Sequence, residues 1–393
     1  MSYMDKLLED VKVEWKRLGE FADYEQPTKY LVSSKRYNDD FTTPVLTAGK
    51  TFILGYTDET DGIYKASETP VIIFDDFTTA IKWVDFDFKA KSSAMKMITS
   101  KDESKALLKY IYYWLNTLPS GLVDGDHKRQ WISNYSKKEI PIPPLEIQKK
   151  IVSILDTFTE LETELTTELN SRKKQYSYYR DHLLNFAEGD VEMKSLNEIG
   201  EFQRGKRFVK TDMISEGVPC IHYGEMYTHY GTWADETKSF VSKELVENKN
   251  LRIAVKGDVV MVAAGETIED IGKGTAWLGD EGVVTHDACF SYRSPLNPKY
   301  VAYFSRTKHF QDQIRRHISS GKISAINAKG LSKVIIPVPS IEEQERIVTI
   351  LDKFDILTTS ISEGLPKEIE LRKKQYEYYR DMLLTFPKDN LNA

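Results

Sequence analysis

The sequence predicts two mixed α/β (α+β) domains, present as two related copies and joined by two long antiparallel coiled-coil helices. Two sequence blocks recur at a nearly fixed separation. Apolar residues within each copy follow the three- and four-residue spacing of a long helix. A segment with both strand-like and helix-like stretches precedes each helix. A repeat of domain plus helix with antiparallel helices has a pseudo-two-fold axis.

The repeat is defined by two pairs of blocks. Ile-Val-Ser-Ile-Leu-Asp-Thr-Phe begins at Ile151, and Ile-Val-Thr-Ile-Leu-Asp-Lys-Phe begins at Ile347, 196 residues later. An Arg-Lys-Lys-Gln-Tyr-x-Tyr-Tyr-Arg-Asp segment begins at Arg172 and again at Arg372, 200 residues later. The second copy therefore has four additional residues between its blocks.

A Pro-x-Pro sequence precedes each helical pattern. Proline cannot occupy a helix interior, so it marks the helix start. We predict a first domain at residues 1–143, a first long helix at 144–187, a second domain at 188–339 and a second long helix at 340–389. Gly364 and Pro366 fall where the four additional residues lie, which predicts a kink or break at 364–366.

Both domains contain predicted strands and helices. The two domains share a similar start, at residues 13–21 and 194–202. β-branched and aromatic runs predict strands at 71–74, 258–262 and 283–292. Helical periodicity predicts helices at 105–118 and 299–317, near the end of each domain, the second capped by Asn297.

Composition indicates a globular protein in a reducing compartment. The 393 residues are 40% hydrophobic and 29% charged, which fits two or three domains with cores of their own. We expect no signal peptide, and the apolar runs are too short to cross a bilayer. Two cysteines, Cys220 and Cys289, form neither a disulfide framework nor a four-ligand zinc site. We therefore expect a cytoplasmic protein.

The net charge of -6 constrains any nucleic-acid function. DNA binding needs local positive potential, so basic residues must gather on one face, or a partner must supply phosphate affinity.

The repeated blocks resemble the conserved regions of type I restriction–modification specificity subunits. The resemblance rests on the Pro-x-Pro entry, Gln148 and Gln344, the Ile-Val-x-Ile-Leu-Asp block and the closing Arg-Lys-Lys-Gln-Tyr segment. Residues 43–49, 55–57, 92–96 and 127–131 resemble one recurring type of target-recognition domain. The resemblance covers nearly the whole chain, and the stretch at 364–366 departs from it.

This resemblance implies a non-catalytic subunit that recognises a bipartite target in double-stranded DNA. It also implies two modification subunits that methylate adenine with S-adenosylmethionine, and two restriction subunits that use ATP and Mg. The chain itself is expected to hold no cofactor or metal. Half-site spacing then depends on helix length. Deleting one tetrad from residues 159–170 moves the chain by about 6 Å and should alter the unread spacer; an unchanged spacer would contradict this idea.

Basic, aromatic and short polar residues predict DNA contacts in both domains. Glycine between Arg204 and Lys206 is compatible with close approach to phosphate. The paired basic segments near residues 125–129 and 321–329 occur at the repeat offset. Each residue taken singly also fits a solvated turn, or, for an aromatic, the core. The candidates are Lys29, Tyr30, Ser33, Lys35, Arg36, His127, Lys128, Arg129, Arg204, Lys206, Arg207, His222, Tyr223, Tyr227, Tyr230, Ser320, Lys322, Ser324, Asn327 and Lys329, with His229 and Trp233 in the same aromatic group.

The closing segments of the two helices predict equivalent docking sites for two copies of one partner. Tyrosine and arginine are typical interface anchors, although an ordinary solvated helix face has the same composition. The candidates are Tyr176, Tyr178, Tyr179, Arg180, Tyr376, Tyr378, Tyr379 and Arg380.

No catalytic motif is convincing. Phosphate-loop and dinucleotide patterns are missing from the sequence, and the sequence after Asn297 lacks the second proline of an adenine methyltransferase loop. His286, Asp287 and Cys289 could be a nucleophile or metal group, but packing or DNA binding explains them better. Two alternatives remain: a stand-alone DNA-binding or scaffold protein, and a methyltransferase in its own right.

Overall fold

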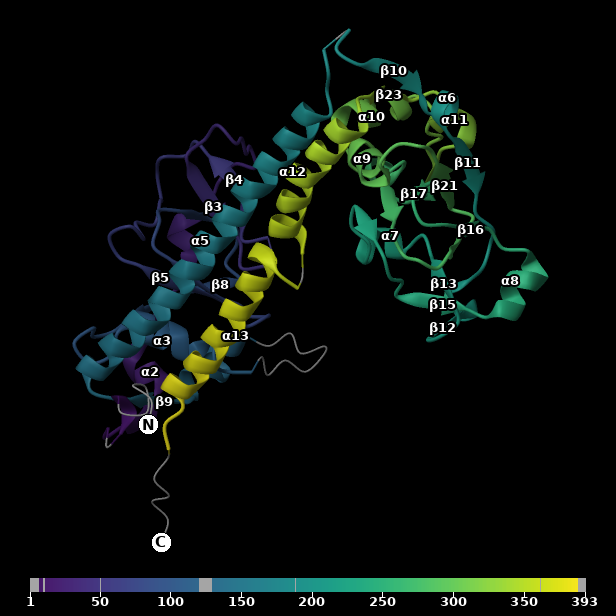
Figure 1. The fold of residues 1–393 in the computed structure, drawn as a ribbon. Coiled ribbons are helices and arrows are strands. Elements are labelled where there is room, and N and C mark those ends of the chain that lie inside the picture. Colours follow the sequence, from purple (N-terminus) through teal and green to yellow (C-terminus); the bar gives the residue numbers. More distant parts are fainter. Residues whose placement is uncertain are drawn as a thin grey trace. The chain divides into compact units, whose positions relative to one another are not determined.

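Two compact units make up the computed structural model of the chain. The structure describes residues 7–9, 11–49, 51–119, 129–187, 189–360 and 362–387. Unit 1 comprises Met1–Glu164 and Leu371–Ala393, and unit 2 comprises Leu165–Glu370. Each unit therefore contains one globular domain, the first part of the helix that follows it and the last part of the other long helix (Figure 1).

The globular part of unit 1 contains a four-stranded antiparallel sheet, in the order β2-β8-β5-β6, and a three-stranded sheet, in the order β4-β3-β7. β5 is buried along its whole length because hydrophobic clusters cover both of its faces: Ile72 and Phe74 belong to one, Val71 and Ile73 to the other. The strands are β2 (Ala22–Glu25), β3 (Thr43–Leu46), β4 (Ile53–Thr57), β5 (Val71–Asp75), β6 (Ile81–Val84), β7 (Lys89–Ala90) and β8 (Met95–Ser100). The short helices are α2 (Leu18–Phe21), η1 (Pro27–Tyr30), α3 (Leu108–Leu115), α4 (Gln130–Ser133) and η2 (Tyr135–Lys137).

The globular part of unit 2 contains two five-stranded sheets, in the orders β11-β21-β17-β19-β14 and β12-β15-β13-β20-β16, and the strand pair β18-β22. The strands are β11 (Glu201–Arg204), β12 (Met213–Ile214), β13 (Val218–Ile221), β14 (Trp233–Ala234), β15 (Ser239–Val241), β16 (Ile253–Ala254), β17 (Val259–Val262), β18 (Ala264–Gly265), β19 (Gly274–Trp277), β20 (Val283–Thr285), β21 (Cys289–Arg293) and β22 (Ser324–Ala325). The short helices are α6 (Leu196–Ile199), η3 (Lys210–Asp212), α7 (Glu225–Thr228), α8 (Lys243–Lys249), η4 (Ile268–Asp270), α9 (Pro298–Phe304), α10 (Lys308–Arg315) and α11 (Ala328–Ser332).

The start of each domain pairs with the strand that leads into its long helix. In unit 1, β1 (Glu14–Arg17) lies antiparallel to β9 (Glu139–Ile142), with Trp15 opposite Pro141. In unit 2, β10 (Glu192–Ser195) lies antiparallel to β23 (Ile335–Val338), with Met193 opposite Pro337. The same ribbon thus closes both domains, as expected of a duplicated sequence.

The long helices differ between the two copies. The first is the continuous α5 (Leu145–Leu183), 39 residues long, and the second consists of α12 (Ile341–Thr359) and α13 (Gly364–Leu384). α12 ends at Thr359 and α13 begins at Gly364, so the break comes just before the predicted 364–366. Gly364 has φ +77°, and Pro366 lies in the first turn of α13. Proline is tolerated there because the N–H groups of the first turn have no partner within the helix.

Aromatic side chains connect the helices within each unit. In unit 1, Phe158 of α5 stacks on Tyr379 of α13 with ring centres 5.4 Å apart, and Glu162 pairs with Lys373 at 3.3 Å. The later residue of α5, Glu162, contacts the earlier residue of α13, Lys373, so the two helices are antiparallel. In unit 2, Phe354 of α12 stacks against Tyr176 and Tyr179 of α5, at 6.3 and 5.4 Å.

A short helix anchors each globular domain to its long helix. In unit 2, Lys299 Nζ lies 2.8 Å from Asp352 Oδ2 and 4.2 Å from the centre of the Trp233 ring. The Tyr303 hydroxyl donates to Asp352 Oδ1 at 2.6 Å. We call these four residues, Trp233, Lys299, Tyr303 and Asp352, the unit 2 anchor.

The unit 1 anchor has the same side chains. Lys109 lies 3.4 Å from Asp156 and 4.2 Å from the centre of the Trp83 ring, and the Tyr113 hydroxyl donates to Asp156. Both copies therefore combine a lysine–carboxylate pair, a tyrosine hydroxyl and a cation–π contact.

Each long helix also carries a buried glutamine that holds its own domain. Gln148 Nε2 donates to the carbonyls of Lys105 and Pro143, and its Oε1 accepts from the Leu107 N–H. Gln344 accepts from the Asn297 N–H and donates to the Pro339 carbonyl.

Three expected elements differ from the sequence prediction. The strand expected at 283–292 is divided into β20 and β21, with a turn at residues 286–288. The helix expected at 299–317 is divided into α9 and α10, because Thr307 caps a new helix by accepting from the Phe310 N–H. The helix expected at 105–118 is limited to α3. The predicted Asn297 cap is confirmed, since its side chain accepts from Lys299 and Tyr300 N–H groups.

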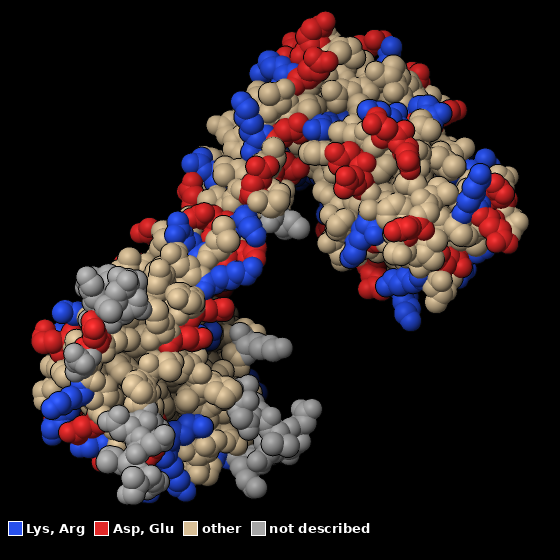
Figure 2. Space-filling view, turned by 60° about the horizontal axis from the view of Figure 1, so that its bottom comes forward, with Lys and Arg blue, Asp and Glu red and all other residues tan. Residues whose placement is uncertain are grey.

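Acidic and basic side chains are intermixed on the face of each unit that Figure 2 shows, so the expected segregation of basic residues is not seen on this face. Among the described residues, no helix is both long enough and apolar enough to span a membrane.

Candidate nucleic-acid interface

Three of the predicted DNA-contact segments of unit 2 lie around one hollow of about 400 Å³, here called the unit 2 hollow. Arg207, His222 and Tyr223 line the hollow. From the segment that contains Ser320 and Lys322, Ile323 lines it. The complete lining is Arg207, Phe208, Val209, Lys210, His222, Tyr223, Ala264, Gly265, Glu266, His286, Asp287, Ala288 and Ile323.

Strand pairing brings these distant segments together. β18 pairs antiparallel with β22, with Gly265 opposite Ser324. The backbones of Ser319 and Ala325 exchange hydrogen bonds of 2.9 and 3.0 Å, so residues 320–323 form the tip of a hairpin. Tyr227 of α7 donates to the Ala264 carbonyl at 3.2 Å, which fixes the tyrosine segment against the same strand.

The basic segment at residues 204–207 is fixed to the turn between β20 and β21. Arg204 Nε donates to the Asp287 carbonyl at 2.9 Å. A Cβ at Gly205 would lie 2.1 Å from the His286 carbonyl oxygen, and Gly205 is buried. The glycine therefore permits close approach of two segments of this chain, and the interpretation as a phosphate contact is wrong for Gly205.

The remaining cations of these segments differ in accessibility. Arg207 and Lys322 are exposed, as is Ser320 beside Lys322. Lys206 is half-buried, and its ammonium donates to the Lys249 carbonyl at 3.4 Å. Arg207 and Lys322 are therefore better placed than Lys206 for phosphate.

Four rings form the wall of the unit 2 hollow. His222 lies with its ring centre 4.6 Å from those of both Tyr223 and His286. Phe208 stands edge-on to His286 at 5.2 Å and to His222 at 5.9 Å. Burial lowers the pKa of both histidines below their ordinary value, against the opposing effects of Glu225 and Asp287. Both imidazoles are therefore neutral at pH 7.

The other aromatic candidates are divided between surface and core. Tyr223 and Tyr227 are 37% and 36% exposed. Tyr230 is buried in the hydrophobic core, and its hydroxyl accepts from the Lys238 N–H at 3.0 Å. His229 is exposed, and Trp233 belongs to the unit 2 anchor.

The segment after the hairpin is mainly structural. Ser324 is buried within β22. Asn327 caps α11 by accepting from the Gly330 N–H at 2.9 Å, which occupies its side-chain oxygen. Lys329 is exposed in α11 and remains available.

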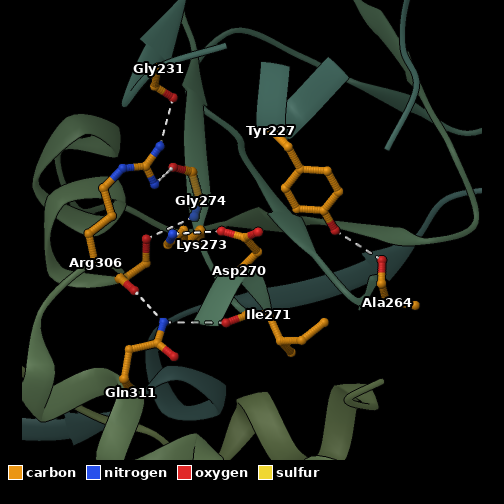
Figure 3. A network of polar contacts seen from close by, with 10 residues as sticks. Tyr227, Gly231, Ala264, Asp270, Ile271, Lys273, Gly274, Arg306 and Gln311 are labelled. Atoms are coloured by element: carbon orange, nitrogen blue, oxygen red, sulfur yellow. Dashed lines mark hydrogen bonds and ion pairs between the residues drawn. The ribbon is translucent and has the colours of Figure 1, made fainter. Parts of the chain in front are cut away.

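A group of polar contacts lies beside the Tyr227–Ala264 hydrogen bond and includes the start of β19 at Gly274 (Figure 3). Arg306 donates to the carbonyls of Gly274 at 2.6 Å and Gly231 at 2.8 Å. Lys273 pairs with Asp270 at 2.7 Å. These cations satisfy groups of the fold itself.

Three candidates of unit 1, Ser33, Lys35 and Arg36, lie on a loop that is held by one carboxylate. Glu59 accepts from the Ser33 and Ser34 N–H groups at 2.9 and 2.7 Å and pairs with Lys89 at 2.9 Å. The Ser33 side chain is exposed on this loop.

The side chains around this loop are partly used within the domain. Lys29 pairs with Glu25 at 2.9 Å, and Tyr30 packs edge-on against Tyr64. Lys35 is exposed, and the exposed Arg36 lies 5.9 Å from the centre of the Phe41 ring. Lys35 and Arg36 are the best placed of this group for phosphate.

His127 and Lys128 lie outside the described residues. Arg129 is exposed and immediately precedes α4. The start of α4 is fixed by Asp76, whose Oδ1 accepts from the Trp131 N–H at 2.9 Å.

The two predicted partner-docking segments have the same geometry. Tyr178 and Tyr378 are 64% and 65% exposed, whereas Tyr176, Tyr179, Tyr376 and Tyr379 contact hydrophobic residues of their own units. Arg180 and Arg380 each pair with the following aspartate and lie 5.8 Å from the ring centre of the preceding Tyr176 or Tyr376. Tyr178 and Tyr378 are therefore the most exposed tyrosines of the two segments, and Tyr179 is also 39% exposed.

Lys210, Glu266 and Ile323 also line the unit 2 hollow, although their sequence pattern did not predict a site; His286 and Asp287 were considered mainly as a doubtful catalytic group. Cys289 is fully buried, and burial raises the pKa of its thiol to about 12, so it is not a thiolate nucleophile. No group of three or more potential metal ligands occurs in the described part of the chain.

Comparison with known proteins defines the class. Residues 10–172 and 188–371 match the family model of the type I restriction modification DNA specificity domain. The chain belongs to the specificity subunits of type I restriction–modification systems, which recognise DNA sequence.

Curated relatives match along the whole chain. The Escherichia coli type I restriction enzyme EcoR124I/EcoR124II specificity subunit is 52% identical over 400 residues, which cover 99% of this chain and 98% of the relative. A putative type I restriction enzyme specificity subunit of Haemophilus influenzae is 31% identical, with 98% of each chain covered.

Solved structures share the fold. The crystal structure of the type I restriction–modification S subunit from M. genitalium superimposes with a TM-score of 0.59 at 16% identity, over 99% of this chain and 100% of the other. A chain from a structural study of type I complex assembly and conformational transition gives a TM-score of 0.58 at 17% identity, over 95% and 98% of the two chains.

Proposed function

We propose that each unit reads one half of a bipartite double-stranded DNA target, and that the chain directs adenine methylation and restriction performed by partner subunits. The convergence of three separate candidate segments on the unit 2 hollow carries this proposal. It provides a concave surface with accessible cations at its edge and neutral rings in its wall. Cations suit phosphate, and fixed donors suit base edges.

The duplicated architecture supports two equivalent half-reading units. Both domains are closed by the same ribbon and held by the same anchor. α5 is continuous between the two globular segments, so its length is a candidate determinant of the unread spacer.

The chain itself acts without catalysis, cofactor or metal in this proposal. Two methyltransferase subunits supply S-adenosylmethionine chemistry, and two restriction subunits supply ATP- and Mg-dependent chemistry. The repeated exposed tyrosines, Tyr178 and Tyr378, support two equivalent contacts for one kind of partner. The EcoR124I relative is named as a subunit of a type I restriction enzyme, which also supports assembly with other subunits.

Selection from a random-sequence duplex library tests the proposal. The chain, purified with its co-expressed methyltransferase partner, should enrich one motif with two conserved halves and an unread gap. The chain alone is selected in parallel, because the contacts of the partner are expected to contribute phosphate affinity.

Other outcomes identify other functions. Enrichment of the same motif by the chain alone, with full affinity, would indicate a stand-alone DNA-binding protein. Calorimetric binding of S-adenosylmethionine to the isolated chain would indicate a methyltransferase. Enrichment of an ungapped motif would contradict the assignment of one half-site to each unit.

A further inference from the structure

The unit 2 hollow contains a preorganised hydrogen-bond donor at its wall. His222 is 4% exposed and lines the hollow. Its Nδ1 accepts from the Gly224 N–H at 3.2 Å, so a neutral His222 carries its proton on Nε2. Among the described residues, none accepts a hydrogen bond from that Nε2. The Nε2 atom is not one of the fully buried polar atoms that lack a partner, so it is open to solvent or to a ligand.

The surrounding side chains hold the imidazole in one orientation. The rings of Tyr223 and His286 lie 4.6 Å from that of His222, and Phe208 packs edge-on against both histidines. His286 is fixed in the same way, because its Nδ1 accepts from the Ala288 N–H at 3.1 Å. Asp287 Oδ1 also lies 3.0 Å from this Nδ1, a contact that becomes an ion pair only when His286 is protonated.

The charges around the hollow favour a base edge over a phosphate group. Arg207 and Lys210 line it, but so do the carboxylates of Glu266 and Asp287. Phosphate would be repelled by the two carboxylates, whereas a base that presents both an acceptor and an amino group can use both kinds of partner. In the major groove adenine presents N7 as acceptor beside its N6 amino donor.

We infer that His222 reads one adenine in the half-site of unit 2, donating from Nε2 to adenine N7 while a carboxylate of the hollow accepts from the N6 amino group. This inference rests on the proposed function of DNA recognition. It adds a specificity-determining contact and the chemical class of the base.

The test is a double-mutant cycle that combines a substitution at His222 with a modified adenine in the DNA. The complex with the methyltransferase partner is prepared as wild type, His222→Gln and His222→Phe, with His309→Phe as a control at an exposed histidine of α10 outside the hollow. Methylation rates are measured on the cognate duplex and on duplexes in which each adenine in turn is 7-deazaadenine, which lacks the N7 acceptor.

Wild-type enzyme should lose about tenfold to a hundredfold at one adenine in one half-site. His222→Phe should lose a similar factor on normal DNA and show no further loss with 7-deazaadenine at that position. His222→Gln, which keeps an N–H donor, should recover part of the rate, and His309→Phe should behave as wild type.

Three results would overturn the inference. A direct contact with N7 would be excluded if, at every adenine, the loss of methylation rate caused by 7-deazaadenine were the same in His222→Phe as in wild type. A uniform loss across all sequences, with a weaker dependence on salt, would identify a phosphate contact. If His222→Phe fails to fold, the wild-type measurements still test the inference. N7 recognition is excluded if 7-deazaadenine lowers the wild-type rate at no position of either half-site. The proposed function fails separately, if wild-type enzyme shows no sequence-specific methylation.

Discussion

Replacing Asp352 with alanine should loosen the globular domain of unit 2 from its long helix. The substitution removes the acceptor of two contacts, from Lys299 at 2.8 Å and from the Tyr303 hydroxyl at 2.6 Å. Hydrogen bonds to a charged group contribute about 1.5–3 kcal/mol each. The lysine and the aspartate are 18% and 24% exposed, so solvent screening reduces the sum to about 3 kcal/mol.

For a unit of this size that loss corresponds to a fall in melting temperature of roughly 6–12 °C. Calorimetry of the full chain measures it, with Asp312→Ala as a control on the exposed face of α10. A cycle with Lys299→Met should show a coupling of about 1–2 kcal/mol, because the two substitutions remove the same contact. A melting temperature equal to that of Asp312→Ala would refute the anchoring role.

Three further predictions concern packing, docking and pH. Gly205→Ala should destabilise unit 2 severely, since its Cβ would lie 2.1 Å from a backbone oxygen. Gly231→Ala is the control and should melt near wild type, because its Cβ meets no atom within 4 Å. Equal melting temperatures of the two variants would contradict this prediction. Tyr178→Ala with Tyr378→Ala should abolish co-purification of the methyltransferase partner without lowering thermal stability, because both side chains are largely exposed; undiminished co-purification would exclude docking there. The two histidines of the hollow have pKa values below 6.5, so their stabilising contribution is complete above pH 6.5 and declines below it, because the unfolded chain then binds more protons. Melting temperatures at pH 7.5 and 5.5 test this, and replacing both with asparagine should flatten the difference.

The duplicated framework was predictable because it depends on local periodicity and on repeated blocks. The anchors were not recognised, although the sequence contains a signal. Lys109-Tyr110 and Tyr113 correspond to Lys299-Tyr300 and Tyr303, a Lys-Tyr-x-x-Tyr pattern. Its two copies lie 190 residues apart, whereas the aspartates of the long helices lie 196 apart, so a search at one offset misses the pattern.

The unit 2 hollow was predictable only in part. Basic and aromatic residues identified three of its segments, but their convergence depends on the pairing of β18 with β22, which are far apart in the sequence. The turn that holds His286 has no glycine or proline, so its apolar flanks predict one uninterrupted strand. Ile323 has no polar signal, and only the hairpin makes it part of the rim.

Adenine methylation sequencing tests the central claim most directly. The chain is co-expressed with the methyltransferase subunit in a host without adenine methylation, and the genomic DNA is sequenced by a single-molecule method. We expect one bipartite motif with an unread gap, methylated once in each half on opposite strands. Methylation at a continuous motif, or a soluble complex that leaves the genome unmethylated, would contradict the claim that the two units of this chain direct methylation by each reading one half of a split target.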